Sequence, residues 1–118
     1  PLSRKKYTAM VNEAKFKSES AAYEKINRTN ELTSEMEMGY RDYLNSLRRV
    51  ILYTRLHELA KNARELLLST FSAAGTDFEE VLRMQEQELM YALELEDARA
   101  MLNTSVAYIN YLTGKNKY

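Results

Sequence analysis

The nine residues Ser72-Ala-Ala-Gly-Thr-Asp-Phe-Glu-Glu80 contain a helix stop that is directly followed by a helix start. Gly75 supplies the left-handed conformation with which many helices end, because glycine lacks the Cβ atom that makes this conformation costly. Thr76 or Asp77 then caps the next helix, with one of the two following glutamates as its capping-box partner. This stretch predicts a tight reversal between two helices, with a turn over residues 73–77.

Upstream of the reversal, the chain from Arg4 to Ser72 has no proline and a single glycine, which predicts one long helix over about residues 4–72. Such a helix is roughly 100 Å long at about 1.5 Å per residue. Apolar residues recur three and four positions apart, as on the buried face of a helix. They form two consecutive stripes, which are Tyr40, Tyr43, Leu44, Leu47 and Ile51, and then Leu52, Leu56, Leu59, Ala63 and Leu66.

One stretch of this first arm allows a second interpretation. Strong helix formers become sparse between Asn27 and Gly39, and Ser34 with Glu37 could form a capping box. A break there would give three helices instead of two, and the N-terminal part would fold back as the third helix of a bundle. Otherwise this part lacks a partner, which predicts self-association or fraying because isolated helices depend on packing for their stability.

Downstream of the reversal, a return helix is expected over about residues 78–113, ending at Gly114. It keeps a heptad pattern throughout, which predicts its buried face. The positions are Val81, Met84, Glu88, Tyr91, Leu95, Ala98, Leu102, Ser105, Ile109 and Leu112. The chain is therefore predicted to be all-α, a single antiparallel helical hairpin or coiled coil with unequal arms.

Composition supports long helices and excludes several functions. Of 118 residues only three are glycine and one is proline, against averages of about 7% and about 5%, so an α/β fold or a β-sandwich is excluded. The formal net charge of zero argues against nucleic-acid binding. The absence of cysteine excludes disulfides, thiolate zinc sites and a cysteine nucleophile. No apolar run reaches the about 18 residues of a membrane span, and a chain that begins at Pro1 is expected to be a processed or excised piece.

The charges are unevenly spread although they sum to zero. Residues 1–30 carry seven basic and three acidic side chains, whereas residues 76–99 carry eight acidic and two basic ones. A solvated helix surface accounts for most of this asymmetry. An acidic reversal could also screen ions that enter a pore.

Catalytic and metal-binding residues are not expected. His57 is the one histidine, and Lys61 stands where a zinc-protease helix would carry its second histidine. The six methionines are better explained by coiled-coil packing than by Cu(I) binding. The nine tyrosines suit a wet seam between helices, where their hydroxyl groups find partners. We therefore expect neither an enzyme nor a cofactor.

The reversal and the return helix resemble the C-terminal repeat of TolC-type outer-membrane efflux channels. That family has a glycine-containing turn, then a (Glu/Asp)-Val-Leu-x-x-Gln pattern, and a helix that closes near Leu-x-Gly. The matching residues are Gly75, then Glu80-Val81-Leu82 and Gln85, and finally Leu112 with Gly114. The resemblance covers essentially the whole chain in the order and length of its arms.

The resemblance implies a homotrimeric channel with an outer-membrane β-barrel and a periplasmic helical barrel, in a Gram-negative bacterium. The turn would meet a periplasmic adaptor protein, which links the channel to an inner-membrane pump. Carried over by position, the adaptor-docking turn comprises Ala73, Ala74, Gly75, Thr76 and Asp77. Glu80 and Arg83 are candidates for the pore gate, although a Glu-Arg pair three residues apart can neutralise itself. Helix capping is an equally good explanation of Glu80.

A second interpretation belongs to another functional class. The chain could be a soluble coiled-coil or helical-bundle interaction module that shares only the pattern, with Gly39 marking a helix break. In both cases the function is binding and not catalysis.

Overall fold

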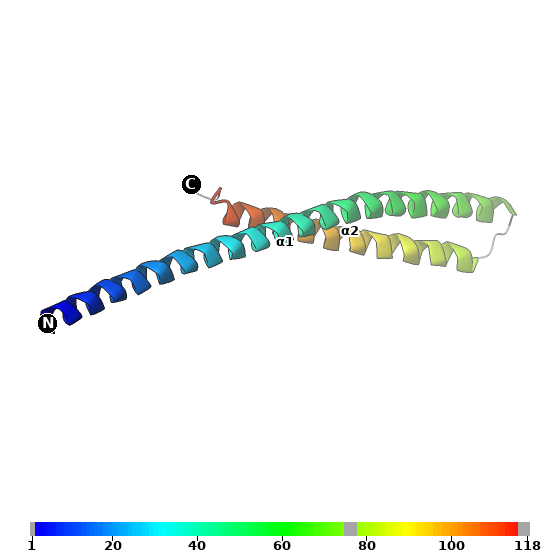
Figure 1. Cartoon of the computed structure of the whole chain (residues 1–118). Coiled ribbons are helices and arrows are strands. Elements are labelled where there is room, and N and C mark those ends of the chain that lie inside the picture. Colours follow the sequence, from blue (N-terminus) through cyan, green and yellow to red (C-terminus); the bar gives the residue numbers. More distant parts are fainter. Residues whose placement is uncertain (1, 75–77, 116–118) are drawn as a thin grey trace. The chain divides into compact units, whose positions relative to one another are not determined.

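The computed structural model describes residues 2–74 and 78–115, and the side chains of residues 2–70 and 78–115. It contains two helices in these ranges, α1 over Leu2–Ala74 and α2 over Phe78–Leu112, and no strand (Figure 1). The all-α helical hairpin predicted from the sequence is confirmed. Contacts along the backbone divide the chain into two units, residues 1–37 and residues 38–118.

The first unit is a stretch of α1 with every side chain from residue 2 to residue 34 exposed. Its helix continues through the region where a break was considered. The hydroxyl groups of Thr29 and Thr33 donate to the backbone carbonyls of Lys25 and Thr29, each at 2.9 Å, as helical threonines commonly do. Because α1 runs unbroken through this region and on past Gly39, the interpretation with three helices is wrong.

The second unit pairs the C-terminal half of α1 with α2 in antiparallel orientation, the cyan-to-green and yellow-to-red ribbons of Figure 1. Residues early in this half of α1 contact residues late in α2, and the reverse holds nearer the reversal. Gly39 lies against Tyr108 and Ile109, whereas Arg64 bonds to Glu88. We call the line where the two helices meet the seam.

On α2 the seam coincides with the predicted heptad positions, since Val81, Leu95, Ala98 and Ser105 are buried. On α1 the predicted face is right in part. Gly39, Ser46 and Ala60 are buried, and the half-buried positions between residues 38 and 70 are Tyr43, Leu44, Leu47, Arg49, Val50, Tyr53, Leu56, His57, Ala63, Arg64 and Leu67. Five of the ten residues of the predicted stripes, Tyr43, Leu44, Leu47, Leu56 and Ala63, are therefore half-buried, whereas Tyr40, Ile51, Leu52, Leu59 and Leu66 are at least half exposed.

Small residues explain this choice of face. Gly39, Ser46 and Ala60 are all buried, and each lies a whole number of heptads from the others. A Cβ atom built on Gly39 would lie 3.2 Å from Cδ1 of Tyr108, so glycine permits a close approach of the helices there and does not mark a bend. The seam is therefore narrow, and the bulky leucines of α1 lie beside it.

The C-terminal end of α2 has the expected glycine cap. Gly114 has a φ of 70°, and its amide donates to the carbonyl of Tyr111 at 3.2 Å. The amide of Lys115 donates to the carbonyl of Asn110 at 3.0 Å. These two bonds form a Schellman motif, which satisfies carbonyl groups that the end of the helix leaves unpaired.

Candidate functional site

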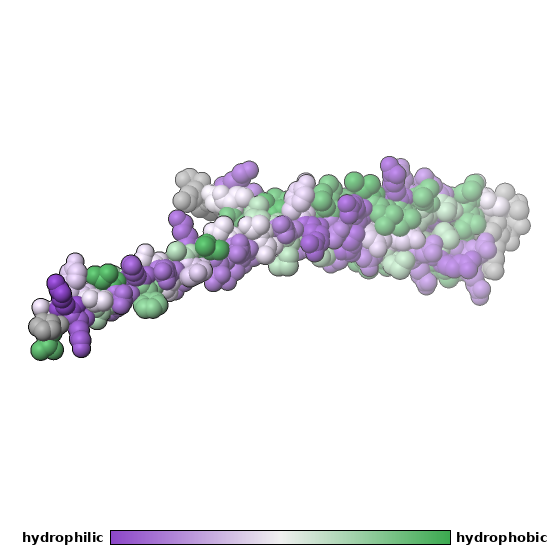
Figure 2. Space-filling model, in the orientation of Figure 1, coloured by the Kyte–Doolittle hydropathy of each residue, from purple (hydrophilic) through white to green (hydrophobic). Residues whose placement is uncertain are grey.

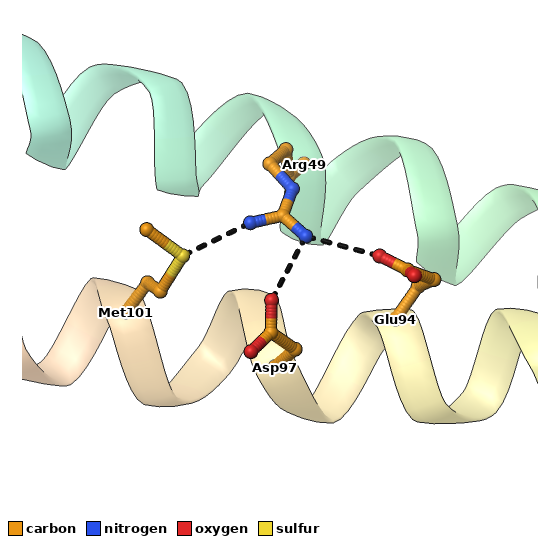
Figure 3. Close-up of polar contacts among 4 residues, drawn as sticks. All are labelled: Arg49, Glu94, Asp97 and Met101. Atoms are coloured by element: carbon orange, nitrogen blue, oxygen red, sulfur yellow. Dashed lines mark hydrogen bonds and ion pairs between the residues drawn. The ribbon is translucent and has the colours of Figure 1, made fainter.

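Arg49 forms the largest polar cluster of the seam (Figure 3). Its Nη2 atom donates to Oε2 of Glu94 and to Oδ2 of Asp97, both at 3.1 Å, and its Nη1 atom lies 3.1 Å from the sulfur of Met101. The hydrogen bond to Asp97 is the main cause that raises the pKa of Arg49 above its usual value. One side chain of α1 thus contacts three successive turns of α2.

Tyrosine rings extend this cluster along the seam. The guanidinium carbon of Arg49 lies 5.8 Å from the ring centroid of Tyr53, which is within the range of a cation–π contact. Tyr53 in turn faces Tyr91 of α2, with ring centroids 6.3 Å apart. The placement of Tyr53 and Tyr91 agrees with the expectation that tyrosines line a polar seam.

A second polar cluster lies nearer the reversal. The guanidinium group of Arg64 bonds to both carboxylate oxygens of Glu88, and Nε2 of His57 lies 4.0 Å from Oε1 of the same glutamate. Arg64 is the main cause that lowers the pKa of Glu88 below its ordinary value of 4.5, and the charges of His57 and Lys61 act in the same direction. Desolvation opposes this shift, because Glu88 is largely covered by the two helices.

This second cluster predicts an acid-sensitive hairpin. Because the pKa of Glu88 is lowered in the folded state, its ionic link stabilises the hairpin above pH 4.5 and is lost as the pH falls through the lowered value. At pH 7 we expect Glu88→Gln to melt at a lower temperature than the unmodified chain, and this difference should shrink as the pH falls below 4.5 and through the lowered pKa of Glu88. Thermal melts followed by circular dichroism measure both effects.

The matched control for that experiment is Glu86→Gln, an exposed glutamate one half-turn away on the same helix. It removes the same charge without touching the seam, so its melting temperature should follow that of the unmodified chain at every pH. A difference between Glu88→Gln and the unmodified chain that does not shrink on acidification would contradict an ionic origin.

The predicted docking turn falls largely outside the described residues. Gly75, Thr76 and Asp77 are not described, and Ala73 and Ala74 form the last backbone positions of α1 without described side chains. The two gate candidates are described. Glu80 and Arg83 lie in the first turns of α2 and form an ion pair of 3.6 Å with both side chains largely in solvent.

Large apolar side chains lie outside the seam on both helices. On α1, Leu52, Leu59 and Leu66 each precede a seam position by one residue and therefore lie about 100° around the helix from it. On α2, Leu82 and Leu89 each follow a seam position by one residue. Figure 2 shows apolar side chains in green gathered along the outer edge of the C-terminal half of α1.

These two leucine stripes lie on opposite flanks of the hairpin. Leu52 follows Arg49 by three residues and so shares its side of α1. Leu89 precedes Glu94, the partner of Arg49, by five residues, which places it about 140° away around α2. Each flank thus carries one leucine stripe, and each stripe comes from a different helix.

The sequence interpretation missed both arginines. Arg49 and Arg64 have no motif of their own, and their partners depend on how the two helices are aligned. One signal was present, because Glu88 interrupts an otherwise mostly apolar heptad series. A carboxylate at a buried position requires a cation from the facing helix.

Among the side chains that the structure describes, no group of three or more histidine, aspartate or glutamate residues is placed to hold a metal ion. Over the same part of the chain, neither helix has a segment apolar and long enough to cross a membrane.

Comparisons of the chain with models of protein families, with curated proteins and with solved structures found no match.

Proposed function

We propose that the chain is a segment of an outer-membrane efflux channel of the TolC type. In this proposal it forms part of the periplasmic α-barrel and supplies the tip that docks an adaptor protein in a tripartite export system. The parent protein is a homotrimer held in the outer membrane by barrel strands, and the adaptor connects it to an inner-membrane pump. The chain itself is a structural and binding element and performs no catalysis.

The observation that supports this proposal best is the pair of leucine stripes on opposite flanks of the hairpin. Leu59, Leu66 and Leu89 are each more than three-fifths exposed, although they recur with heptad spacing like core residues. Contiguous exposed apolar surface typically marks a site of protein association. A hairpin with one such stripe on each flank is suited to a neighbour on both sides, as a stave in a barrel of helices requires.

The ion pair of Glu80 and Arg83 fits the gate part of the proposal in a limited way. Because the two side chains neutralise each other, they supply a polar ring near the tip without a strong net charge. The acidic excess of the first half of α2 then comes from Glu79 in the first turn and from residues farther along the helix, including Glu86 and Glu94. Such a tip selects for ions less strongly than a ring of unpaired glutamates would.

Binding to adaptor hairpins tests the proposal directly. Helical hairpins of periplasmic adaptor proteins are immobilised, and retention of the chain is compared with retention of Gly75→Arg. We expect the substitution to weaken binding by tenfold or more, because an arginine side chain prevents the close backbone contact that the small residues of the turn would permit. Binding is measured by surface plasmon resonance.

Ala107→Arg is the matched control, since it places the same side chain at an exposed helical position of α2 far from the turn, without touching the seam or the glycine cap. It should bind adaptor hairpins as the unmodified chain does. If no adaptor hairpin binds, or if Gly75→Arg binds equally well, the docking assignment is wrong. The soluble coiled-coil interaction module then becomes the better interpretation.

A further inference from the structure

The seam by itself does not select one alignment of α1 against α2. Its buried residues include Gly39, Ser46 and Ala60 on α1 and Ala98 and Ser105 on α2, which are small and recur at heptad intervals. Sliding one helix by seven residues keeps the heptad positions of both helices in the seam, although it changes which side chains face one another. In an antiparallel hairpin, such a slip requires the turn to move by only half a heptad along the chain, so the connection gives limited protection.

The Arg49 cluster does distinguish between alignments. In the observed alignment Arg49 bonds to Glu94 and Asp97. A slip of seven residues in one direction replaces these two acceptors by Met101 and Thr104. A slip in the other direction replaces them by Gln87 and Met90 but brings Glu94 to the place of Met101, beside Nη1 of Arg49. Arg49 therefore loses both carboxylates in one direction and keeps one of them in the other.

The Arg64 cluster distinguishes between alignments even more sharply. Its partner Glu88 is replaced by Val81 after a slip in one direction and by Leu95 after a slip in the other. Both of these positions are buried, with 2% and 8% of their surface exposed. A slip would therefore hold the guanidinium of Arg64 against an apolar part of the seam without a counterion, which is strongly unfavourable.

We propose that Arg49 and Arg64 fix the alignment of α1 against α2 by making every neighbouring heptad register leave an arginine without its carboxylate partner. This role is separate from the proposed channel function and holds for the chain on its own. It resembles the way in which single polar residues in coiled-coil seams select one register. The apolar and small residues of the seam supply attraction, and the two arginine clusters supply specificity.

Spin-label distances test the register itself and not merely stability. The chain contains no cysteine, so Asn62→Cys and Asn103→Cys introduce two labels at exposed positions. Because Gly39 lies against Ile109, residue 62 lies opposite residue 86, and the two labels are roughly 25 Å apart along the helix axes at about 1.5 Å per residue. A slip of one heptad changes that separation by about 10 Å. Pulsed electron paramagnetic resonance on the whole chain resolves such a change.

In the labelled chain we expect one distance population. Arg49→Leu combined with Arg64→Leu should add a second population displaced by about 10 Å. The matched control is Arg48→Leu with Arg55→Leu, which removes two exposed arginines of the same helix and should keep the single population. Exchanging the two charges of the ion pair, as Arg64→Glu with Glu88→Arg in an Arg49→Leu background, should also keep the single distance population.

The variant with both Arg49→Leu and Arg64→Leu could lose its helical signal. In that case, moving the carboxylate partner of Arg64 to another position gives the decisive test. Glu88→Leu with Leu95→Glu, in the Arg49→Leu background, moves the acceptor of Arg64 by one heptad. The label separation should then shorten by about 10 Å as the hairpin re-aligns. An unchanged distance in this variant, or a single unchanged distance in a folded double leucine variant, overturns the proposal.

Discussion

Leu95→Ala is expected to lower the free energy of unfolding by about 2–4 kcal/mol, the range for truncating a buried leucine. Leu95 is 8% exposed and is the largest of the buried apolar side chains in the described part of the hairpin. The other buried apolar residues there are Ala60, Val81 and Ala98, none of which can fill the space left by the lost carbons. Since small domains are stable by only about 5–15 kcal/mol, this loss is a large share of the total.

Leu93→Ala is the matched control, because Leu93 lies two residues away on α2 and is 64% exposed. The same atoms are removed without opening a cavity, so the free energy of unfolding should change by less than about 0.5 kcal/mol. Urea titrations followed by circular dichroism compare the two variants. Equal losses would mean that the outer face of α2 is as well covered as the seam, which would contradict the antiparallel pair described above.

The return helix could be predicted closely from the sequence. One mostly apolar heptad series, interrupted by Glu88, runs along its whole length, and the buried residues Val81, Leu95, Ala98 and Ser105 all belong to that series. The reason is physical. In a helix with a single partner, the repeat of about 3.5 residues leaves only one face available for burial.

The face of α1 could be predicted only in part by the same rule, because α1 has apolar residues on several sides. The large apolar residues dominate the sequence pattern. Helices nevertheless approach most closely where side chains are small, and the small residues Gly39, Ser46 and Ala60 define the face of α1 that meets α2. Their heptad spacing was visible in the sequence. It was outweighed by the leucine stripes, which suit neighbours outside the hairpin.

The possible break between residues 27 and 39 was overruled by the continuity of the surrounding helix. Local weakness in helix propensity amounts to less than about 1 kcal/mol per residue and is often overridden. Thr29 and Thr33 satisfy their hydroxyl groups within the helix, so neither diverts the backbone into a turn. Gly39 contributes a close contact with Tyr108, which compensates for its poor helix propensity.

The polar clusters show what sequence patterns leave out. Arg49 meets Glu94 and Asp97 only in one alignment of the helices, and alignment is a property of the pair. The docking turn was the opposite case, since its residues could be proposed from the sequence but lie mostly outside the described residues. The adaptor-binding experiment therefore tests the proposed function, and the spin-label experiment tests the proposed role of the two arginines.

A hairpin of this kind separates two tasks between its surfaces. The seam holds α1 and α2 together through small residues and ionic links, including those of Arg49 and Arg64. The leucine stripes, including Leu59 and Leu89, remain on the flanks for other molecules. Under the proposed function, this division leaves the strongest apolar surface for assembly with neighbouring hairpins.

Ala98→Leu tests whether small residues set the spacing of the helices. Ala98 is completely buried, so three added carbon atoms have no free space and must push α1 and α2 apart. We expect a loss of about 2–3 kcal/mol in the free energy of unfolding, toward the upper end of the usual cost of overpacking. Helix propensity contributes little to this loss, because leucine and alanine are both strong helix formers. Urea titration measures it.

Ala100→Leu makes the same exchange at an exposed position two residues away and should change stability by less than about 0.5 kcal/mol. The comparison has a clear alternative outcome. If Ala98→Leu stabilised the hairpin, the added side chain would have filled unused space, and the seam would be looser than its buried small residues indicate. If only Ala98→Leu loses stability, the narrow seam and the Arg49 cluster depend on the same close approach of the helices. Asp97 is the residue next to Ala98, and its 3.1 Å bond to Arg49 requires that approach.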